Sequence, residues 1–226
     1  MSLLTSDDLE AILLSVKVAA TATVVGLPPA LLVAHILARR RFPGKSMLDA
    51  LTHLPLVLPP VATGYLLLVL LGRQGMIGAA LAKIGAVFVF HWTGAALASA
   101  IMAFPLMVRP IRLSIEAIDR QVEDAARTLG ASPAARLWRV TLPLAAPGLI
   151  AGAVLGFARA LGEFGATITF VAAIPGETLT LPSAIYLATQ TPGAETRALA
   201  LCGVSLVIAF SAILIGEAVG RRAAPR

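Results

Sequence analysis

The main pattern along the chain is an alternation of short charged segments and long uncharged ones. A helix that crosses about 30 Å of hydrocarbon needs about 20 residues, and five uncharged stretches come close to or exceed that length. The last two are the shortest, and we expect them to extend past flanking charges that can snorkel to an interface. The five expected spans are Val18–Ala38, Ala50–Gly72, Ile84–Val108, Val140–Ala158 and Ala198–Gly216.

A sixth apolar region, Leu161–Arg197, is interrupted too often to read as a span. Glycine and proline are the strongest local breakers of helices, and we single out six within it. The sequence therefore predicts broken helices here. The breakers are Gly162, Gly165, Pro175, Gly176, Pro182 and Pro192.

Composition agrees with a membrane location. Hydrophobic residues make up 58% of the chain and charged residues 13%, whereas soluble domains are about 45–50% apolar and about 25% charged. A single core of this length cannot hide so much apolar surface from water. These numbers exclude a disordered chain and an ordinary soluble domain. The fold class that we expect is an all-α integral membrane protein with about five transmembrane helices, forming one domain over residues 1–226.

The net charge of +6 carries information mainly through its position. Thirteen of the 18 basic residues fall on one side in a five-span arrangement: four follow the first span, six lie between the third and fourth, and three are at the C-terminal end. By the positive-inside rule, the N-terminus lies outside and the C-terminus in the cytoplasm. The charges follow the first apolar run, so we expect this span to be retained. A nucleic-acid partner is not needed to explain the basic balance.

The cytoplasmic stretch between spans three and four, residues 109–139, predicts two helices joined by a break. Gly130 is expected to end the first helix, and Ser132-Pro133 to begin the next at its N-cap and first position. Asp124, expected near a helix start, supplies one anchoring charge. Ala125 and Ala126 are small enough to let another surface approach closely. A solvated hairpin between helices is the alternative for these three residues taken alone.

The wider spacing favours a docking role over that alternative. Asp124-Ala125-Ala126 is followed by three residues and Gly130, then nine residues, Val140, one residue and Leu142-Pro143. This spacing resembles the Glu-Ala-Ala loop of the membrane subunits of ABC importers, with Asp124 in place of glutamate. The resemblance implies that residues 109–143 form a cytoplasmic coupling loop on which ATPase subunits dock.

Two further runs resemble the permeases of bacterial molybdate importers, within the sulfate, tungstate and molybdate group. The first is Leu54 to Tyr65, LPLVLPPVATGY, and the second is Gly162 to Phe170, GEFGATITF, followed by IPGET and LPSAIY. The resemblance covers nearly the whole chain. It departs at Val171-Ala172-Ala173, where a smaller and more polar turn of the type Ala-Gly-Asn is expected.

The same two runs contain the candidates for a translocation pathway. Prolines inside a span free backbone groups, which lipid tolerates only where those groups face protein or a water-filled cavity, and discontinuous helices often line transport paths. A proline-kinked packing helix is the alternative, which applies to Pro55 as well. The candidates are Pro59, Pro60, Thr63, Glu163, Thr167 and Thr169.

The polar candidates each have a second interpretation. Glu163 is an ionisable group at a membrane depth and so a functional candidate, but Arg159 lies four residues earlier on the same helical face and can pair with it. An unpaired carboxylate would repel an oxyanion. Thr167 and Thr169 offer hydroxyl donors for an anion, or they bond their own helix backbone.

Four small residues recur every fourth position in the fourth expected span: Gly148, Gly152, Gly156 and Ala160. Such a face allows two helices to approach closely, within one subunit or across a dimer.

Other residue patterns exclude several chemistries. Gly44-Lys45-Ser46 resembles the end of a phosphate-binding loop, but position 39 is arginine instead of the first glycine, so the ATP site must lie on another chain. His35, His53 and His91 lack paired ligand spacing, and a single cysteine gives no cysteine-rich site, so we expect no metal and no cofactor. No set of acid, base and nucleophile converges, which argues against an intramembrane enzyme.

The resemblance implies a multi-pass permease of the bacterial cytoplasmic membrane that carries molybdate by alternating access. It implies two cytoplasmic ABC ATPase subunits and an external oxyanion-binding protein. We expect a homodimer, because a chain of this size needs a second subunit, of the same or another permease, to enclose a pore. Sulfate or tungstate remains an alternative cargo. A passive channel is a more distant alternative, and it would not need a docking hairpin.

Overall fold

The computed structural model describes residues 4–223, and within this range all regular elements are helical. Three of the helices are long and apolar enough to cross a membrane by themselves: α1 (Ser6–Arg39), α5 (Trp92–Glu116) and α12 (Glu195–Ala223). Two bent pairs of helices bring the number of candidate spans among the described residues to as many as five, if each pair forms one span. The expected fold class is confirmed.

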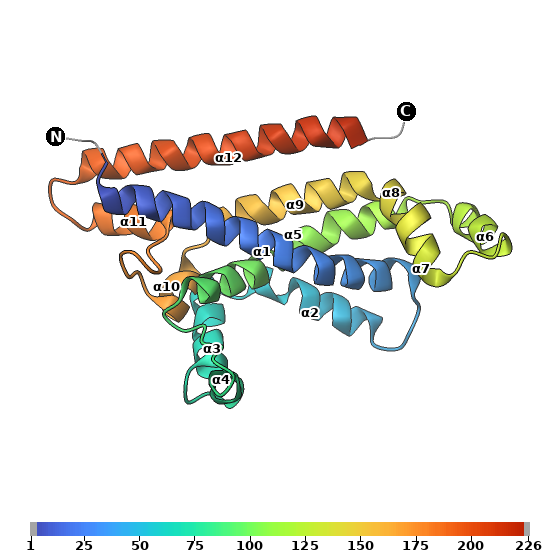
Figure 1. Ribbon diagram of the computed structural model, residues 1–226, viewed down its shortest axis with the longest axis horizontal. Coiled ribbons are helices and arrows are strands. Elements are labelled where there is room, and N and C mark those ends of the chain that lie inside the picture. The colour runs from blue at the N-terminus through green and yellow to red at the C-terminus, as the bar shows by residue number, and fades with distance from the viewer. Residues whose placement is uncertain (1–3, 224–226) are drawn as a thin grey trace.

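Three helices form the packed centre of the molecule. α1 and α5 pack against each other and against α9 (Ala146–Leu161), side by side in Figure 1. The main cluster of buried side chains lies between them and is rich in alanine from α1, including Ala30 and Ala34, with Met107 and Ile111 from α5. Small residues permit close helix approach where lipid supplies no hydrophobic drive for association.

The expected glycine face of α9 meets α5 of the same chain. A Cβ atom added at Gly148 would collide with Ser114 and Pro110, and one at Gly156 with the side chain of Met107. The packing is therefore within one subunit, which the sequence alone left open.

The second expected span is not one straight helix. It consists of α2 (Lys45–Val57) and α3 (Pro60–Leu71), which meet at an angle of 111°. Because Leu58 and Pro59 are extended, the chain turns sharply, and α3 leaves the bundle almost at right angles with the short helix α4 (Met76–Ala82) at its end (Figure 1). Pro55 lies inside α2, so it does not break the helix, and the break is at Leu58 and Pro59.

The expected third span, Ile84–Val108, is wrong at its start. Residues 84–91 are irregular, because Gly85 and Phe90 take positive φ angles and the His91 side chain caps the first turn of α5. The helix then continues past Arg109 to Glu116, since a charge near a helix end does not by itself stop the helix.

The fourth expected span, Val140–Ala158, is bent instead of straight. A hairpin of α6 (Arg120–Thr128), α7 (Pro133–Arg136), the π-helical turn η1 (Leu137–Thr141) and α8 (Leu142–Leu144) comes first. At Ala145 the chain bends by 72° into α9. α1 and α12 contain the first and last expected spans.

The interrupted region is broken as predicted. It holds α10 (Gly165–Val171), which packs against α3 and α5, and α11 (Leu181–Thr189), which packs against α1 and α12. The N-terminal end of α1 lies with α10 and α11 at one end of the molecule, and the hairpin and the C-terminal end of α12 lie at the other (Figure 1).

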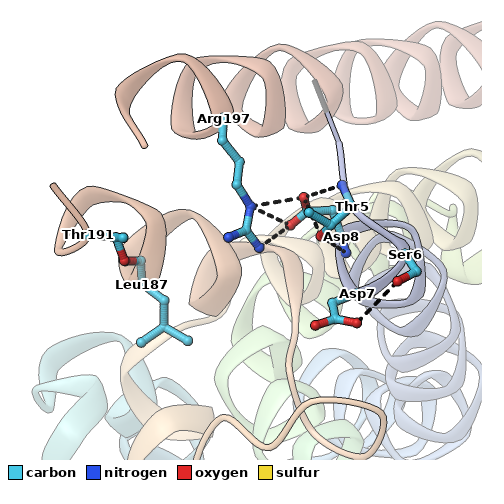
Figure 2. A network of polar contacts seen from close by, with 7 residues as sticks. All are labelled: Thr5, Ser6, Asp7, Asp8, Leu187, Thr191 and Arg197. Carbon is cyan, nitrogen blue, oxygen red and sulfur yellow. Dashed lines mark hydrogen bonds and ion pairs between the residues drawn. The ribbon is translucent and has the colours of Figure 1, made fainter. Parts of the chain in front are cut away.

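α12 is fastened to the bundle at its first turns. The Arg197 guanidinium makes two hydrogen bonds of 2.7 and 2.9 Å to the two carboxylate oxygens of Asp8, and Asp8 also caps α1 through Thr5 (Figure 2). Asp8 is fully buried. Further along α12 most large side chains, such as Leu206 and Phe210, are exposed, as expected for a surface that faces lipid.

Candidate functional site: a crossing of two broken helices and a polar hairpin

The two sequence runs that contain the pathway candidates are brought together in the fold. α3 and α10 cross so closely that a Cβ atom added at Gly64 would lie 2.9 Å from the Cα atom of Ala166. One added at Gly165 would lie 2.8 Å from the ring of Pro60. Because each helix presents a glycine to the other, their backbones are almost in contact. The sequence pattern located both segments, and the structure shows that they form one crossing.

Proline and the preceding break set the direction of α3. Pro59 is the N-cap of α3 and is exposed, and Pro60 is its first residue and half-buried. Proline at this position costs no helical hydrogen bond, because the first amides of a helix have no partner anyway. The two residues therefore start a new helix at the crossing.

Glu163 fixes the second break, between α9 and α10. Its side chain is 1% exposed, and its Oε2 lies 2.6 Å from Nη1 of Arg159. Its Oε1 accepts a hydrogen bond of 2.8 Å from the amide of Ala166, in the first turn of α10. The carboxylate is thus both the partner of a cation on α9 and the cap of α10. The ion pair between Arg159 and Glu163 that the spacing allowed is confirmed.

The hydroxyls of the three threonine candidates differ in their bonding. Thr167 donates to the carbonyl oxygens of Glu163 and Phe164, at 3.2 and 2.9 Å, and Thr169 donates to that of Gly165 at 2.8 Å. A hydroxyl has one hydrogen, so neither is a free donor in this conformation. Thr63 is 7% exposed, and its hydroxyl has no partner among the described residues.

The crossing is consequently polar without carrying net charge. The Arg159 guanidinium is neutralised by Glu163, and the threonine hydroxyls are dipoles. An unpartnered buried hydroxyl such as that of Thr63 costs free energy unless a water molecule or a ligand satisfies it. This arrangement can bind a polar molecule weakly but offers no strong binding site for a dianion. Within residues 4–223 there is also no cluster of three or more His, Cys, Asp or Glu residues that could hold a metal ion.

The second part of the site is the hairpin at the opposite end of the molecule. Gly130 takes a φ of +82° just after α6, and Ser132 caps α7 with Pro133 in its first position. Only glycine adopts such a φ without steric cost. The predicted helix, break and helix are confirmed.

The expected place of Asp124 within its helix is wrong. Asp119 caps α6 by accepting a hydrogen bond of 2.9 Å from the amide of Gln121, so Asp124 lies beyond the first turn. Its side chain is exposed, as is Ala125, while Ala126 is half-buried.

The hairpin presents apolar side chains to the outside. Val122 is 45% exposed, Leu129 88% and Trp138 69%. Leu142 and Pro143, which end the spacing motif, form α8 directly before the bend into α9. Exposed apolar side chains on an otherwise charged hairpin are typical of a protein contact surface.

Glu123 is a functional candidate that the sequence interpretation missed. It lies next to Asp124 but points inward: its Oε2 is 3.1 Å from Nε of Arg39, and its Oε1 accepts a hydrogen bond of 2.9 Å from Thr141. The available signal was helical geometry, since adjacent residues on a helix point about 100° apart. Two neighbouring acids on α6 cannot both face the same surface.

Comparison with known proteins now defines the class. Residues 26–225 match the model of the family described as binding-protein-dependent transport system inner membrane component. The chain belongs to this family, and it is a multi-pass permease subunit of the cytoplasmic membrane.

The relatives of highest sequence identity are molybdenum transport permeases. The chain is 54% identical over 220 residues to the molybdenum transport system permease protein ModB of Escherichia coli K12, covering 97% of this chain and 96% of the relative. It is 52% identical to ModB of Haemophilus influenzae, over 95% of this chain and 94% of that protein. A sulfate transport system permease protein, CysT of Escherichia coli K12, is 37% identical, over 85% of this chain and 70% of that protein.

Solved structures agree on the fold. A chain of a bacterial ABC transporter that imports the acidic polysaccharide alginate matches with a TM-score of 0.77 at 18% identity, over 97% of this chain and 80% of that chain. A chain of the MetNI methionine ABC transporter, in inward-facing conformations, matches with a TM-score of 0.72 at 16% identity, over the full length of both. At these identities the likeness concerns the fold alone.

Proposed function

We propose that this chain is the membrane permease of an ATP-driven importer of molybdate. The observation that carries the proposal is its identity of 54% to a molybdenum transport permease over 97% of the chain. The geometry supplies the two parts that such a subunit needs, a docking hairpin and a polar crossing. Residues 1–226 would act as one transmembrane domain, with no ATP site of their own.

The motor and the delivery protein would be separate chains. The hairpin within residues 109–143 would receive a cytoplasmic ABC ATPase, two per complex, and an external binding protein would deliver the oxyanion. Nucleotide binding would bias an equilibrium between inward-open and outward-open forms. The bend at Ala145 leads from the hairpin into α9, and α9 leads to Glu163 and α10, so movement of the hairpin would reach the crossing along the chain itself.

The ends of the molecule support the expected orientation. The hairpin and the C-terminal end of α12 lie together, opposite the N-terminal end of α1 (Figure 1). The basic cluster Arg39, Arg40 and Arg41 ends α1 on the hairpin side. The positive-inside rule places that side in the cytoplasm. In a Cys202→Ser background, a cysteine at Gln190 should react with an impermeant maleimide from outside, and one at Thr128 should not.

A second copy of the chain would complete the pathway. Next to the crossing, α3 projects away from the packed centre (Figure 1), so its outer face is not covered by the bundle. Beside the crossing α3 and α4 expose apolar side chains, among them Val61, Tyr65 and Met76. In the Cys202→Ser background, a cysteine placed at Val61 should form a cross-link with the same cysteine of a second copy. A cysteine placed at Leu206, on the lipid-facing part of α12, should not. Equal cross-linking at both positions would contradict this interface.

The cargo is tested by purifying the tagged chain from its native membrane with its partners. Hydrolysis of ATP stimulated by a molybdate-loaded binding protein would support both the class and the cargo. Stimulation by sulfate or tungstate alone would keep the class and change the cargo. A chain that purifies without any ATPase would contradict the proposal and favour a channel.

Docking is tested at the turn of the hairpin. Gly130→Arg places a bulky side chain at a φ that only glycine tolerates well, within the proposed contact surface. We expect the ATPase to be lost during purification while membrane insertion persists. Gly44→Arg is the matched control, because Gly44 also takes a positive φ, +91°, has nothing within 4 Å of a Cβ atom, and lies outside the hairpin. A Gly130→Arg chain that still retains its ATPase at wild-type yield would refute the docking assignment.

The pathway is tested at Thr63. Thr63→Val keeps the shape of the side chain and removes the hydroxyl that has no protein partner. We expect molybdate uptake by reconstituted vesicles to fall by about tenfold, the cost of about one hydrogen bond to a charged group. Thr169→Val is the matched control, because its hydroxyl serves its own helix. If both variants transport alike, Thr63 has no special place in the pathway.

A further inference from the structure

We infer that Glu123 is a positioning residue that couples the hairpin to α1, distinct in role from its neighbour Asp124. The inference rests on the proposed docking of an ATPase on the hairpin. It assigns to one carboxylate the task of passing hairpin movement into the packed centre of the molecule.

The contacts of Glu123 join three elements at one point. Its carboxylate, on α6, lies 3.1 Å from Nε of Arg39 at the end of α1, and it accepts a hydrogen bond of 2.9 Å from Thr141 in η1. Arg39 in turn donates a hydrogen bond of 3.1 Å to the carbonyl oxygen of Ile118, just beyond α5. The end of α1, the end of α5, the hairpin and the turn before α9 therefore share one polar junction.

Burial makes this junction more rigid than a surface ion pair. The side chains of Arg39 and Glu123 are 10% and 17% exposed. Charges that are shielded from water interact more strongly, and removing one partner leaves the other uncompensated. By contrast Arg221 and Glu217 on α12, at 2.7 Å, are 77% and 57% exposed, where an ion pair contributes little.

The surrounding geometry suits a transmission point. Thr141 closes a π-helical turn, and such turns are rare and frequent at functional sites. The chain then bends by 72° into α9. α1 packs against both α5 and α9. A shift of α6 would thus act on α9 through the chain and on α1 through Glu123, moving two helices of the centre together.

The two neighbouring acidic residues, Glu123 and Asp124, have different roles in this inference. Asp124 is exposed on the outer face of α6 and available to a partner, whereas Glu123 faces the membrane domain. Loss of Asp124 should therefore weaken docking. Loss of Glu123 should leave docking intact, but the docked ATPase should no longer drive transport efficiently.

The test uses the complex of the chain with its ATPase and binding protein, reconstituted in liposomes. The readout is the ratio of ATP hydrolysis with molybdate-loaded binding protein to hydrolysis without it, together with the yield of co-purified ATPase. Glu123→Gln should keep the wild-type yield and lower the ratio about tenfold, within the usual range of coupling between two sites. Glu217→Gln is the control and should change neither value.

A double-mutant cycle separates coupling from general damage. Because Glu123 and Arg39 act as one unit, Glu123→Gln combined with Arg39→Gln should lower the ratio no further than either change alone. Losses that multiply would overturn the inference. Thr141→Val, which keeps both charges, should lower the ratio by a smaller factor and serves if the charge variants fail to fold.

The outcomes also separate this inference from the proposed function. A wild-type chain that recovers no ATPase would contradict the proposed function itself. A wild-type complex that is stimulated normally, beside a Glu123→Gln complex with an unchanged ratio, would overturn only the role of Glu123.

Discussion

α1 and α12 are both long apolar helices, yet they are held in opposite ways. In the most apolar stretch of α1, 39% of residues are buried within the chain, against 11% in α12. α1 lies between α5 and α9 through small side chains, whereas α12 is fixed near its start by Arg197 and touches α9 through Gly216 near its end. The central helices α1, α5 and α9 are held by close packing along their length. The outer helix α12 is held by contacts at a few separate positions.

This difference matters for a transporter because lipid is as apolar as a leucine side chain. Without a hydrophobic drive, helices associate through van der Waals contact and polar bonds. Close packing along α1, α5 and α9 makes them move as one body. A helix fixed at points can follow that body while its other face remains in lipid. The comparison predicts that substitutions in the centre have large effects and that those on α12 depend strongly on position.

The largest effect is expected at the glycine face of α9. A Cβ atom at Gly148 would lie 2.6 Å from the backbone oxygen of Pro110, and a backbone atom cannot move aside like the end of a side chain. Gly148→Val should therefore separate α9 from α5 and prevent recovery of a monodisperse protein in detergent. Gly203→Val on α12, where the space is open, is the matched control. A normal yield of Gly148→Val would show that α9 and α5 can separate without loss of the fold.

The next effect is expected at the fastening point of α12. Asp8→Asn removes the charge that faces Arg197 and leaves a half-buried guanidinium without its partner (Figure 2). Breaking a buried ion pair costs about 3–5 kcal/mol. Because Arg197 is partly exposed, we expect the free energy of unfolding to fall by an amount at the lower end of this range, about 3 kcal/mol. The measurement is thermal unfolding in detergent. A melting temperature equal to that of the wild type would mean that other contacts hold α12.

A smaller effect of opposite sign is expected where α10 ends. Ala172 takes φ +61° and ψ −165°, a region that only glycine occupies readily, at a cost of about 1–3 kcal/mol for other residues. Ala172→Gly should raise the free energy of unfolding by about 1 kcal/mol. Ala173→Gly is the control and should lower it or leave it unchanged. A destabilised Ala172→Gly variant would contradict a positive φ at this position.

Ala172 also illustrates what the sequence could and could not reveal. The run Val171-Ala172-Ala173 was the one place where the sequence departed from the expected Ala-Gly-Asn turn, and the structure shows that a glycine conformation persists there without the glycine. The departure marked the position, but the positive φ and its strain become visible only in the backbone angles.

Local features were predicted well because local residues determine them. The hairpin turn at Gly130, the cap at Ser132 and the interrupted region after Leu161 follow from neighbouring residues. The expected start of the third span at Ile84 was wrong, and the bend at Ala145 was not predicted, because counting from charge to charge cannot detect a positive φ or a bend. Both are fixed by contacts and backbone angles.

Long-range features needed the structure. The sequence located the runs around Gly64 and Gly165 but not their crossing, because Gly165 was interpreted only as a local break and nothing in the sequence paired it with Gly64. Arg39 and Glu123 were each visible as charges, yet no spacing connects the end of the first span with a hairpin far along the chain. Contacts between residues far apart in the chain depend on the tertiary structure, and a single sequence does not reveal them.

The smallest effect is expected at the far end of α12. Glu217 and Arg221 form an ion pair of 2.7 Å with both side chains mostly exposed. An exposed pair four residues apart on a helix contributes about 0.3–0.5 kcal/mol, and salt screens it. Glu217→Gln should therefore shift the melting temperature far less than Asp8→Asn, and raising the salt concentration should remove the remaining difference. A loss at Glu217 as large as that at Asp8 would show that α12 is fixed along its whole length, because only a buried pair can contribute that much.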